Sequence, residues 1–234
     1  YILTMKKIME CVPNFSEGRN MEVMEAILEP FKHTEGMTLL DWSHDEDHNR
    51  MVVTLVGEPE ALKTSVIEAV KIAVKKIDLN HHTGQHPRMG AVDVIPFVPV
   101  KGVTQEEAIE LSKEVGKIIG EEIGIPVFLY EDSATTPERQ NLAKIRKGQF
   151  EGMKEKIHEP EWHPDFGPSD IHPTAGVVAV GARMFLVAYN VNLDDPNVDH
   201  ATAIAKRVRH IGGGLHFCKG MGVDLTERHQ SQVS

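Results

Sequence analysis

The sequence predicts an α+β fold in which helices cover one face of a sheet. Apolar segments rich in β-branched residues recur along the 234 residues, and stretches of helical periodicity separate many of them. Several predicted strands follow each other directly, as in a hairpin, instead of alternating strictly with helices. The pattern stops at residues 162–176, which are rich in proline and glycine, and then starts again. This restart predicts a second subdomain.

Most of the predicted elements precede residue 160. The densely charged residues 43–50 lie between two predicted strands, as the turn of a hairpin would. Thr104, followed by Glu107 three positions later, predicts a capping box at a helix start, and Gly124 is placed to end that helix. The predicted strands are residues 7–13, 37–42, 51–57, 91–100 and 127–130, and the predicted helices are residues 21–32, 60–77, 104–124 and 138–147.

The proline–glycine segment, residues 162–176, is too long for an idle connection, and loops of this length in compact domains are usually functional or disordered. Trp162, Phe166 and Ile171 favour an ordered loop, because each has an apolar surface to bury. Beyond it, we expect strands at residues 177–180, 184–193 and 215–223 and a helix at residues 199–210. The glycines at 212–214 follow that helix, so they predict a helix end and not a phosphate-binding loop.

Composition excludes several classes of protein. The formal charge of −10 argues against a general nucleic-acid-binding protein. We see neither an apolar stretch of membrane-spanning length nor a signal-peptide pattern, and therefore expect a cytoplasmic protein without membrane contact. Cys11 and Cys218 are too few and too far apart in sequence for a disulfide framework.

Residues 81–96, the histidine segment, carry the most chemistry. Gly84, Pro87 and Gly90 favour a loop, which leads into the predicted strand. Pro87 restricts the preceding backbone to extended conformations, and the fixed cation of Arg88 follows closely. An imidazole beside such a cation suits proton transfer near an anionic substrate. The three histidines of the segment are His81, His82 and His86.

Other interpretations of the histidines stay open on pattern alone. A cluster of histidines in a loop is more often solvated polar surface than a catalytic site. His82 and His86 could bind a metal, although Gly84 between them argues against the helix that such spacing usually needs. The charged hairpin offers His44, Asp45, Asp47 and His48 to a metal, but such tips are usually just solvated.

Four motifs, in order, make the chain resemble the glutamate formimidoyltransferase family. They are ECVPNFSEG at residues 10–18, Asn49–Arg50 before a strand, GQHPRMGAVDVIPFVPV at residues 84–100, and WHPDFGPSDIHPTAG at residues 162–176. The resemblance extends from Met5 to the end of the chain. It implies a folate-dependent enzyme of histidine degradation and one-carbon metabolism.

The resemblance implies two ferredoxin-like subdomains with tetrahydrofolate, a co-substrate, bound in the cleft between them. Residues 1–181 would form the first subdomain, and residues 182–234 would begin a second that is incomplete and C-terminally truncated in this chain. The implied reaction moves a formimidoyl group between N-formimidoyl-L-glutamate and N5 of tetrahydrofolate. We expect these small molecules as partners, no metal, and a homodimer.

The resemblance also implies site residues. The family's catalytic histidine corresponds to His86, and an acidic residue that assists in animal members corresponds to Ser43, which leaves Asp45 or Asp47 as substitutes. Arg50 and Arg88 are the cations nearest in sequence to this site, so we expect them to bind the carboxylates of glutamate. The family's folate-binding loop corresponds to Gly167, Pro168, Ser169, Asp170, Ile171, His172, Pro173, Thr174, Ala175 and Gly176.

Two rival functions remain. A metal-dependent hydrolase would use His82, His86 and the charged hairpin. A folate-binding module without activity would have kept the binding surface and lost the chemistry.

Overall fold

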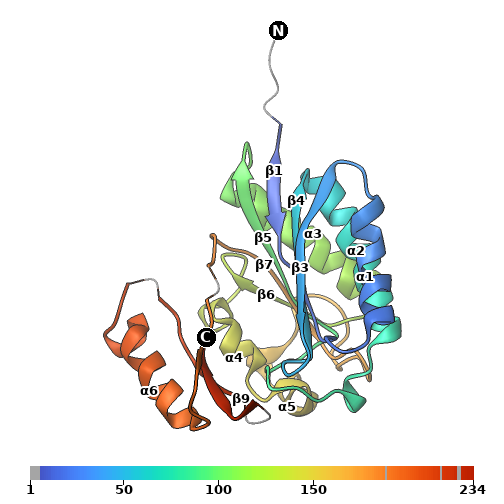
Figure 1. Ribbon diagram of the computed structural model, residues 1–234. Coiled ribbons are helices and arrows are strands. Elements are labelled where there is room, and N and C mark those ends of the chain that lie inside the picture. The colour runs from blue at the N-terminus through green and yellow to red at the C-terminus, as the bar shows by residue number, and fades with distance from the viewer. Residues whose placement is uncertain (1–5, 188, 217, 226–227) are drawn as a thin grey trace. The chain divides into compact units, whose positions relative to one another are not determined.

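The computed structural model describes residues 6–187, 189–216, 218–225 and 228–234, which form two compact units (Figure 1). Of these described residues, the first unit contains 6–83 and 87–184, and the second contains 84–86 and those from 185 onward. Both units combine helices with a sheet, so the predicted α+β fold is confirmed. Among the described residues, no helix is long and apolar enough to cross a membrane.

The first unit is built on a β-α-β-β-α-β core. Its strands are antiparallel in the order β3-β4-β1-β5, and β2 continues β1 between β4 and β5. This succession and order are those of a ferredoxin-like unit. The elements are β1 (Ile8–Cys11), β2 (Asn14–Phe15), α1 (Met21–His33), β3 (Met37–Asp45), β4 (Arg50–Gly57), α2 (Pro59–Lys76) and β5 (Val92–Lys101).

Two parallel strands extend this sheet beyond β5. After α3 (Gln105–Ile118) and a π-helical turn at Ile119–Ile123, the chain forms β6 (Val127–Glu131) and later β7 (Val178–Ala182). β7 lies between β5 and β6 and is parallel to both. The predicted capping box of α3 is confirmed, because the side chains of Thr104 and Glu107 each accept the other's backbone N–H.

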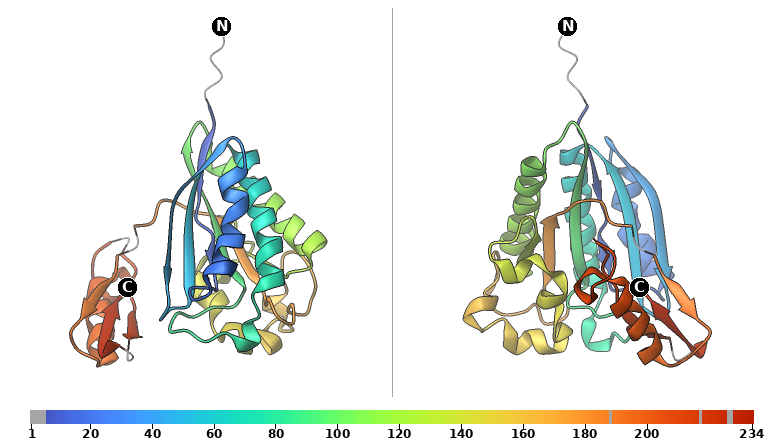
Figure 2. Two further views of the ribbon diagram at one scale, coloured as in Figure 1. Left: turned by 45° about the vertical axis from the view of Figure 1, so that its right-hand side comes forward. Right: turned by 90° about the vertical axis from the view of Figure 1, so that its left-hand side faces the viewer.

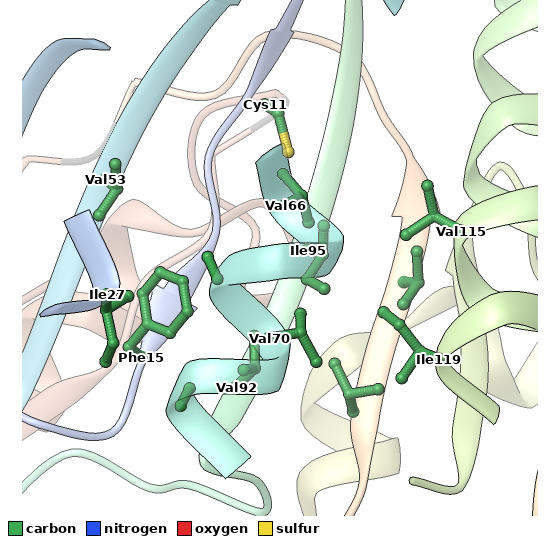
Figure 3. Close-up of a cluster of buried hydrophobic side chains, with 14 of the residues drawn as sticks. Cys11, Phe15, Ile27, Val53, Val66, Val70, Val92, Ile95, Val115 and Ile119 are labelled. Carbon is green, nitrogen blue, oxygen red and sulfur yellow. The ribbon is translucent and has the colours of Figure 1, made fainter. Parts of the chain in front are cut away.

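The main core lies between the sheet and α1, α2 and α3, which cover the same face (Figure 2). Phe15 packs near Ile27, while Val66 and Val70 of α2 point toward strand residues such as Ile95 (Figure 3). Each such apolar side chain contributes about 1.5–3 kcal/mol when it is buried. The parallel extension therefore shares one hydrophobic core with the ferredoxin-like part.

The expectation that helices cover only one face is wrong for the parallel strands. Val178, Val180 and Ala182 of β7 point into the main core, whereas Ala179 points to the opposite face and joins a second cluster. That cluster includes Ile145 of α4 (Leu142–Arg146) and Met153 of α5 (Gln149–Lys156). Parallel strands need cover on both faces, and α4 and α5 provide it.

The helix predicted at residues 138–147 is also corrected. A 3-10 turn occupies Pro137–Gln140 and ends before Asn141. The side chain of Asn141 accepts the backbone N–H of Ala143, so α4 starts as a separate helix. Gly148, with φ of +92°, then turns the chain into α5, which the sequence analysis did not predict. Short 3-10 turns also occupy Leu79–His81 and Pro160–Trp162.

The described residues of the second unit form an antiparallel three-stranded sheet and one α-helix. The strand order is β8-β10-β9, which matches the relative order of the first three strands of a ferredoxin-like unit. The elements are β8 (Val191–Leu193), α6 (Val198–Val208), a 3-10 turn at His210–Gly212, β9 (Gly222–Leu225) and β10 (Gln230–Val233).

Two predicted strands of this unit are much shorter than expected. The strand predicted at 184–193 exists only as β8, and that predicted at 215–223 begins at Gly222; residues 188 and 217 lie outside the described residues. Apolar composition favours a strand, but a strand also needs a hydrogen-bonding neighbour. Of the described residues between 184 and 193, only Val191–Leu193 pair with β10. β10 itself was not predicted, because its QSQV sequence is polar.

Candidate active site

The part of the histidine segment that precedes β5 is a loop, as predicted. It connects the 3-10 turn Leu79–His81 to β5. His82 and Arg88, on either side of His86, belong to the first unit, whereas His86 itself belongs to the second. The side chain of His86 is half-buried. Side chains of the β3–β4 turn and of α5, together with backbone contacts from the proline–glycine segment, hold the ends of this loop.

Arg88 is only 6% exposed, and its guanidinium makes five hydrogen bonds within the protein. Nε donates to Nδ1 of His82 at 3.1 Å, and one Nη2 hydrogen goes to the backbone oxygen of the same residue at 3.3 Å. Nη1 and Nη2 donate to the two carboxylate oxygens of Glu151 at 2.9 and 2.7 Å, and Nη1 also reaches Gln149 at 3.2 Å. A guanidinium has five N–H donors, so every donor of Arg88 has an acceptor.

His82 has partners at both ring nitrogens. Its Nδ1 accepts from Arg88, so Nε2 carries the proton and donates to the backbone oxygen of Asn49 at 3.0 Å. Burial lowers the pKa of the His82 imidazole below its ordinary value, and the positive charge of Arg88 acts in the same direction. His82 is therefore neutral and fixed in one tautomer at neutral pH.

Asn49 joins three segments of the first unit. It adopts a φ of +48°, a conformation that asparagine tolerates better than most residues, at the turn between β3 and β4. Its side chain accepts the N–H of Gly18 at 2.9 Å and donates to the backbone oxygen of Thr83 at 3.0 Å. The motif at residues 10–18 and the hairpin thus meet at the start of the histidine loop.

A second charged group lies at the start of β5. Asp93 has no exposed surface, and its Oδ2 contacts Nη1 of Arg50 at 3.0 Å and Nη2 of Arg146 at 2.6 Å. Oδ1 accepts the backbone N–H of Met89 at 2.8 Å. Burial lowers the pKa of Arg50 to about 10, which still leaves it charged at neutral pH. The buried cation of Arg50 and the cation of Arg146, whose side chain is 13% exposed, thus share one carboxylate, and Nε of Arg50 also donates to Asn14 at 3.1 Å.

The end of the proline–glycine segment lies beside both sides of the histidine loop within the first unit. Gly176 forms an isolated antiparallel bridge with Gly90, and Ala91 donates to Ala175 at 2.9 Å. On the other side of the loop, Leu79 donates its N–H to the oxygen of Thr174 at 2.8 Å. These contacts join the two longest motifs of the chain.

Internal bonds shape the proline–glycine segment as well. His172 pairs with Gly176, and its Nδ1 accepts the N–H of Ala175 at 3.0 Å. At the other end, Phe166 pairs with Val127 and packs on the core, while residues 167–170 are exposed. The segment is a structured loop that is anchored near both ends and exposed in its middle.

The charged hairpin is more structured than a solvated tip. Asp45 belongs to β3, and its Oδ1 accepts the N–H of His48 at 2.8 Å. His44 contacts the backbone oxygen of Gly18 through Nδ1, and Ser43 is exposed on β3. Among the residues that the structure describes, no group of histidine, cysteine, aspartate or glutamate has an arrangement that could hold a metal ion.

A cavity of about 800 Å³ lies elsewhere, at the starts of α2 and α3. Its lining includes six glutamates, among them Glu58 and Glu107, but only two lysines, Lys6 and Lys7. A surplus of carboxylates repels an anionic ligand, so this cavity does not suit glutamate or folate.

Comparison with known proteins decides the family. Residues 8–183 match the sequence model of the formiminotransferase domain, N-terminal subdomain. The chain belongs to the formiminotransferase family. It is 57% identical over 230 residues to glutamate formimidoyltransferase of Streptococcus pyogenes serotype M1. The aligned region covers 98% of this chain and 77% of that protein.

Longer relatives match the same residues. Formimidoyltransferase-cyclodeaminase is 48% identical in Dictyostelium discoideum and 44% identical in Mus musculus, in each case over 98% of this chain. The chain spans 44% and 43% of these two proteins, so it covers less than half of their length. The resemblance seen in the four motifs is thereby confirmed, and the family is one of enzymes.

Sequence reasoning missed three residues of this candidate site. Asp93 had a signal, since a carboxylate within an apolar strand usually has a buried partner. Arg146 and Glu151 had none, because charged residues on short helices are ordinary surface residues in most proteins. The predicted roles of His86, Arg50, Arg88 and residues 167–176 concern ligands and stay predictions.

Proposed function

We propose that the chain transfers a formimidoyl group between N-formimidoyl-L-glutamate and N5 of tetrahydrofolate in histidine degradation, with His86 as general acid–base. The observation that carries this proposal is family membership, with a relative at 57% identity named for this transfer. The contacts of the histidine loop support it further, because they anchor the residues on both sides of His86.

The chemistry suits an imidazole. N5 of tetrahydrofolate attacks the formimidoyl carbon, and a tetrahedral centre forms. The bond from this carbon to the glutamate nitrogen then breaks; N5 loses a proton and the glutamate nitrogen gains one. Histidine performs both transfers near neutral pH, and acid–base catalysis of this kind contributes roughly 10²–10⁴-fold to the rate. The reaction as written needs no metal, redox step or phosphate transfer.

The two proposed carboxylate-binding arginines differ in what they can offer. Arg50 uses Nε and Nη1 within the protein. Arg50 and Arg146 together carry two positive charges, whereas the carboxylate of Asp93 between them carries one negative charge. Arg88 would have to exchange an acceptor such as Glu151 for a substrate carboxylate, because all five of its donors are engaged. Arg50 is therefore the stronger candidate of the two.

Folate would contact residues 167–176 in this proposal. The pairing of Gly176 with Gly90 supports it, because the end of this loop and the end of the histidine loop are hydrogen-bonded to each other. By resemblance to the family we also propose a cytoplasmic homodimer that acts on small molecules.

Transfer of the formimidoyl group by the purified chain tests the proposal. Tetrahydrofolate and N-formimidoyl-L-glutamate are supplied, and released glutamate and 5-formimidoyltetrahydrofolate are measured together. Equal amounts of both products support the proposal. Tight tetrahydrofolate binding without either product would favour the folate-binding module.

Metal analysis of the same preparation addresses the hydrolase. Both ring nitrogens of His82 are engaged by Arg88 and Asn49, which argues against His82 as a metal ligand. A stoichiometric metal with glutamate release in the absence of tetrahydrofolate would favour the hydrolase over the transferase.

A further inference from the structure

The base of the histidine loop is closed by one side chain. Residues 83–87 separate His82 from Arg88, and the guanidinium of Arg88 contacts both the imidazole and the backbone oxygen of His82. Two bonds to one residue fix the orientation of that residue as well as its distance. The two ends of the five-residue loop that contains His86 are therefore tied to each other.

Glu151 controls the position of that guanidinium. Its two carboxylate oxygens accept from Nη1 and Nη2 of Arg88 at 2.9 and 2.7 Å, the bidentate geometry in which a carboxylate matches the planar fork of arginine. The hydrogen bonds from Arg88 lower the pKa of Glu151 to about 2, so Glu151 is ionised throughout the neutral range. The side chain of Glu151 is 63% exposed, whereas that of Arg88 is 8% exposed.

The start of α5 binds the backbone of Arg88 in addition. Phe150 donates its N–H to the oxygen of Arg88 at 3.0 Å, and the N–H of Arg88 points to the side chain of Gln149 at 3.4 Å. Gly148 and Gln149 both have positive φ, +92° and +56°, which turns the chain so that these contacts form. Such a conformation at Gln149 is strained, and the contacts to Arg88 compensate for it.

Asn49 ties the other end of the loop, through its bonds to Thr83 and His82. The chain of contacts thus runs from Glu151 through Arg88 and His82 to Asn49, entirely within the first unit. Loss of Glu151 would leave the guanidinium of Arg88 with neutral acceptors only, namely His82 and Gln149. The hydrogen bonds of Arg88 to His82, and of Asn49 to His82 and Thr83, would then have to hold the ends of the loop without Glu151.

We propose that Glu151 is a positioning residue for His86, which it influences through Arg88 and His82 without contacting substrate. This inference rests on the proposed function for its kinetic consequence. A loosened loop would present His86 in many orientations, and a displacement of about 1 Å at a catalytic group costs roughly 10²-fold in rate. We therefore expect a loss in kcat and little change in the KM for either substrate.

The test compares Glu151→Gln with Glu151→Asp and with a matched control, Glu155→Gln. Glu155 is exposed on the same helix, so its substitution removes the same charge from α5 without touching Arg88. We expect kcat to fall by about 10–100-fold in Glu151→Gln, to recover in part in Glu151→Asp, which keeps a carboxylate, and to stay unchanged in Glu155→Gln.

Hydrogen exchange gives a second readout that does not need activity. In Glu151→Gln the amides of residues 83, 85, 86 and 88 should exchange at least about 10-fold faster than in Glu155→Gln, while those of β5 keep their protection. If the wild-type chain is inactive but this difference is found, the proposed function fails and the positioning role stands. Equal exchange and equal kcat in the two variants would overturn the proposal. An equal loss of protection in β5 would also overturn it, since Glu151 would then serve only stability.

Discussion

The guanidinium of Arg146 on α4 donates to the carboxylate of Asp93 at 2.6 Å, and Asp93 has no exposed surface. The same oxygen accepts from Arg50, and the other oxygen accepts the N–H of Met89. One side chain on β5 therefore joins β4, α4 and the end of the histidine loop. A buried carboxylate with two cations is costly to disturb, because removal of its charge leaves both cations uncompensated.

Asp93→Asn should strongly destabilise the first unit. The amide keeps the size of the carboxylate but removes its charge, so the buried Arg50 and the largely covered Arg146 remain close to each other without this anion. We expect a loss of about 3–5 kcal/mol in the free energy of unfolding, measured in urea. Asp41→Asn, at an exposed position on β3, is the control and should stay within about 0.5 kcal/mol of wild type. A loss below about 1 kcal/mol for Asp93→Asn would contradict this account.

The free energy of unfolding should also decrease as the pH is lowered, because His82 is buried. Its pKa in the folded chain is lowered from 6.5, mainly by burial, so the unfolded chain takes up a proton first as the pH falls. The contribution is complete above pH 6.5 and is lost progressively as the pH falls through 6.5 toward the folded pKa. One proton allows a slope of at most about 1.4 kcal/mol per pH unit.

Urea unfolding of wild type, His82→Gln and His81→Gln measures this effect between about pH 7.5 and about pH 5, the range in which imidazoles titrate. His82→Gln should remove part of the slope. His81 is 85% exposed at its side chain, so His81→Gln should retain the wild-type slope. Identical curves for wild type and His82→Gln would show that the burial of His82 has no such consequence.

His86→Ala should lower turnover by about two to four orders of magnitude while it largely spares tetrahydrofolate affinity. The reason is that an acid–base catalyst acts on the transition state more than on the bound ground state. Steady-state kinetics and a separate binding measurement check it, with His81→Ala as the control on the same segment. If His82→Ala abolished turnover and His86→Ala left it nearly unchanged, His82 and not His86 would be the acid–base catalyst.

Much of the fold followed from the sequence because local patterns specified it. The capping box at Thr104 and Glu107 formed as predicted, and β-branched segments became β4 and β5. Where prediction failed, a distant partner decided the outcome. The stretch before β8 has strand composition, but its described residues have no strand partner before Val191, and α5 starts where Gly148 turns the chain toward Arg88.

The candidate site was predictable only in part for the same reason. His86 and Arg88 stand out in the sequence because turn residues surround them. The partner of Arg88 does not, since Glu151 lies 63 positions away on a helix without a strong apolar pattern. A single sequence contains no signal that pairs two such residues.

Gly90→Ala should disrupt the junction of the two loops. A Cβ at this position would lie 1.9 Å from the backbone oxygen of Val177 and 2.6 Å from that of Val92, and neither atom is able to move as a side chain does. We expect a loss of about 1–3 kcal/mol or more in stability, as for other overpacked sites. In the control, Gly152→Ala, nothing lies within 4 Å of the new Cβ, and alanine in helix α5 should stabilise by about 0.5–1 kcal/mol.

Hydrogen exchange should separate the two units. β5 is a central strand with neighbours on both sides, and seven of its ten residues are buried. β8 has three residues, two of them exposed, and pairs with β10 alone among the described strands. Amides in β5 should therefore exchange near the rate of global unfolding, whereas those of Val191–Leu193 should exchange through local opening of much lower free energy. The measurement is made at two protein concentrations, because a strand added to the edge of β8 by a second copy would raise its protection with concentration. Equal, strong protection of β5 and β8 in a monomer would show that the small sheet is stable on its own, and this prediction would be wrong.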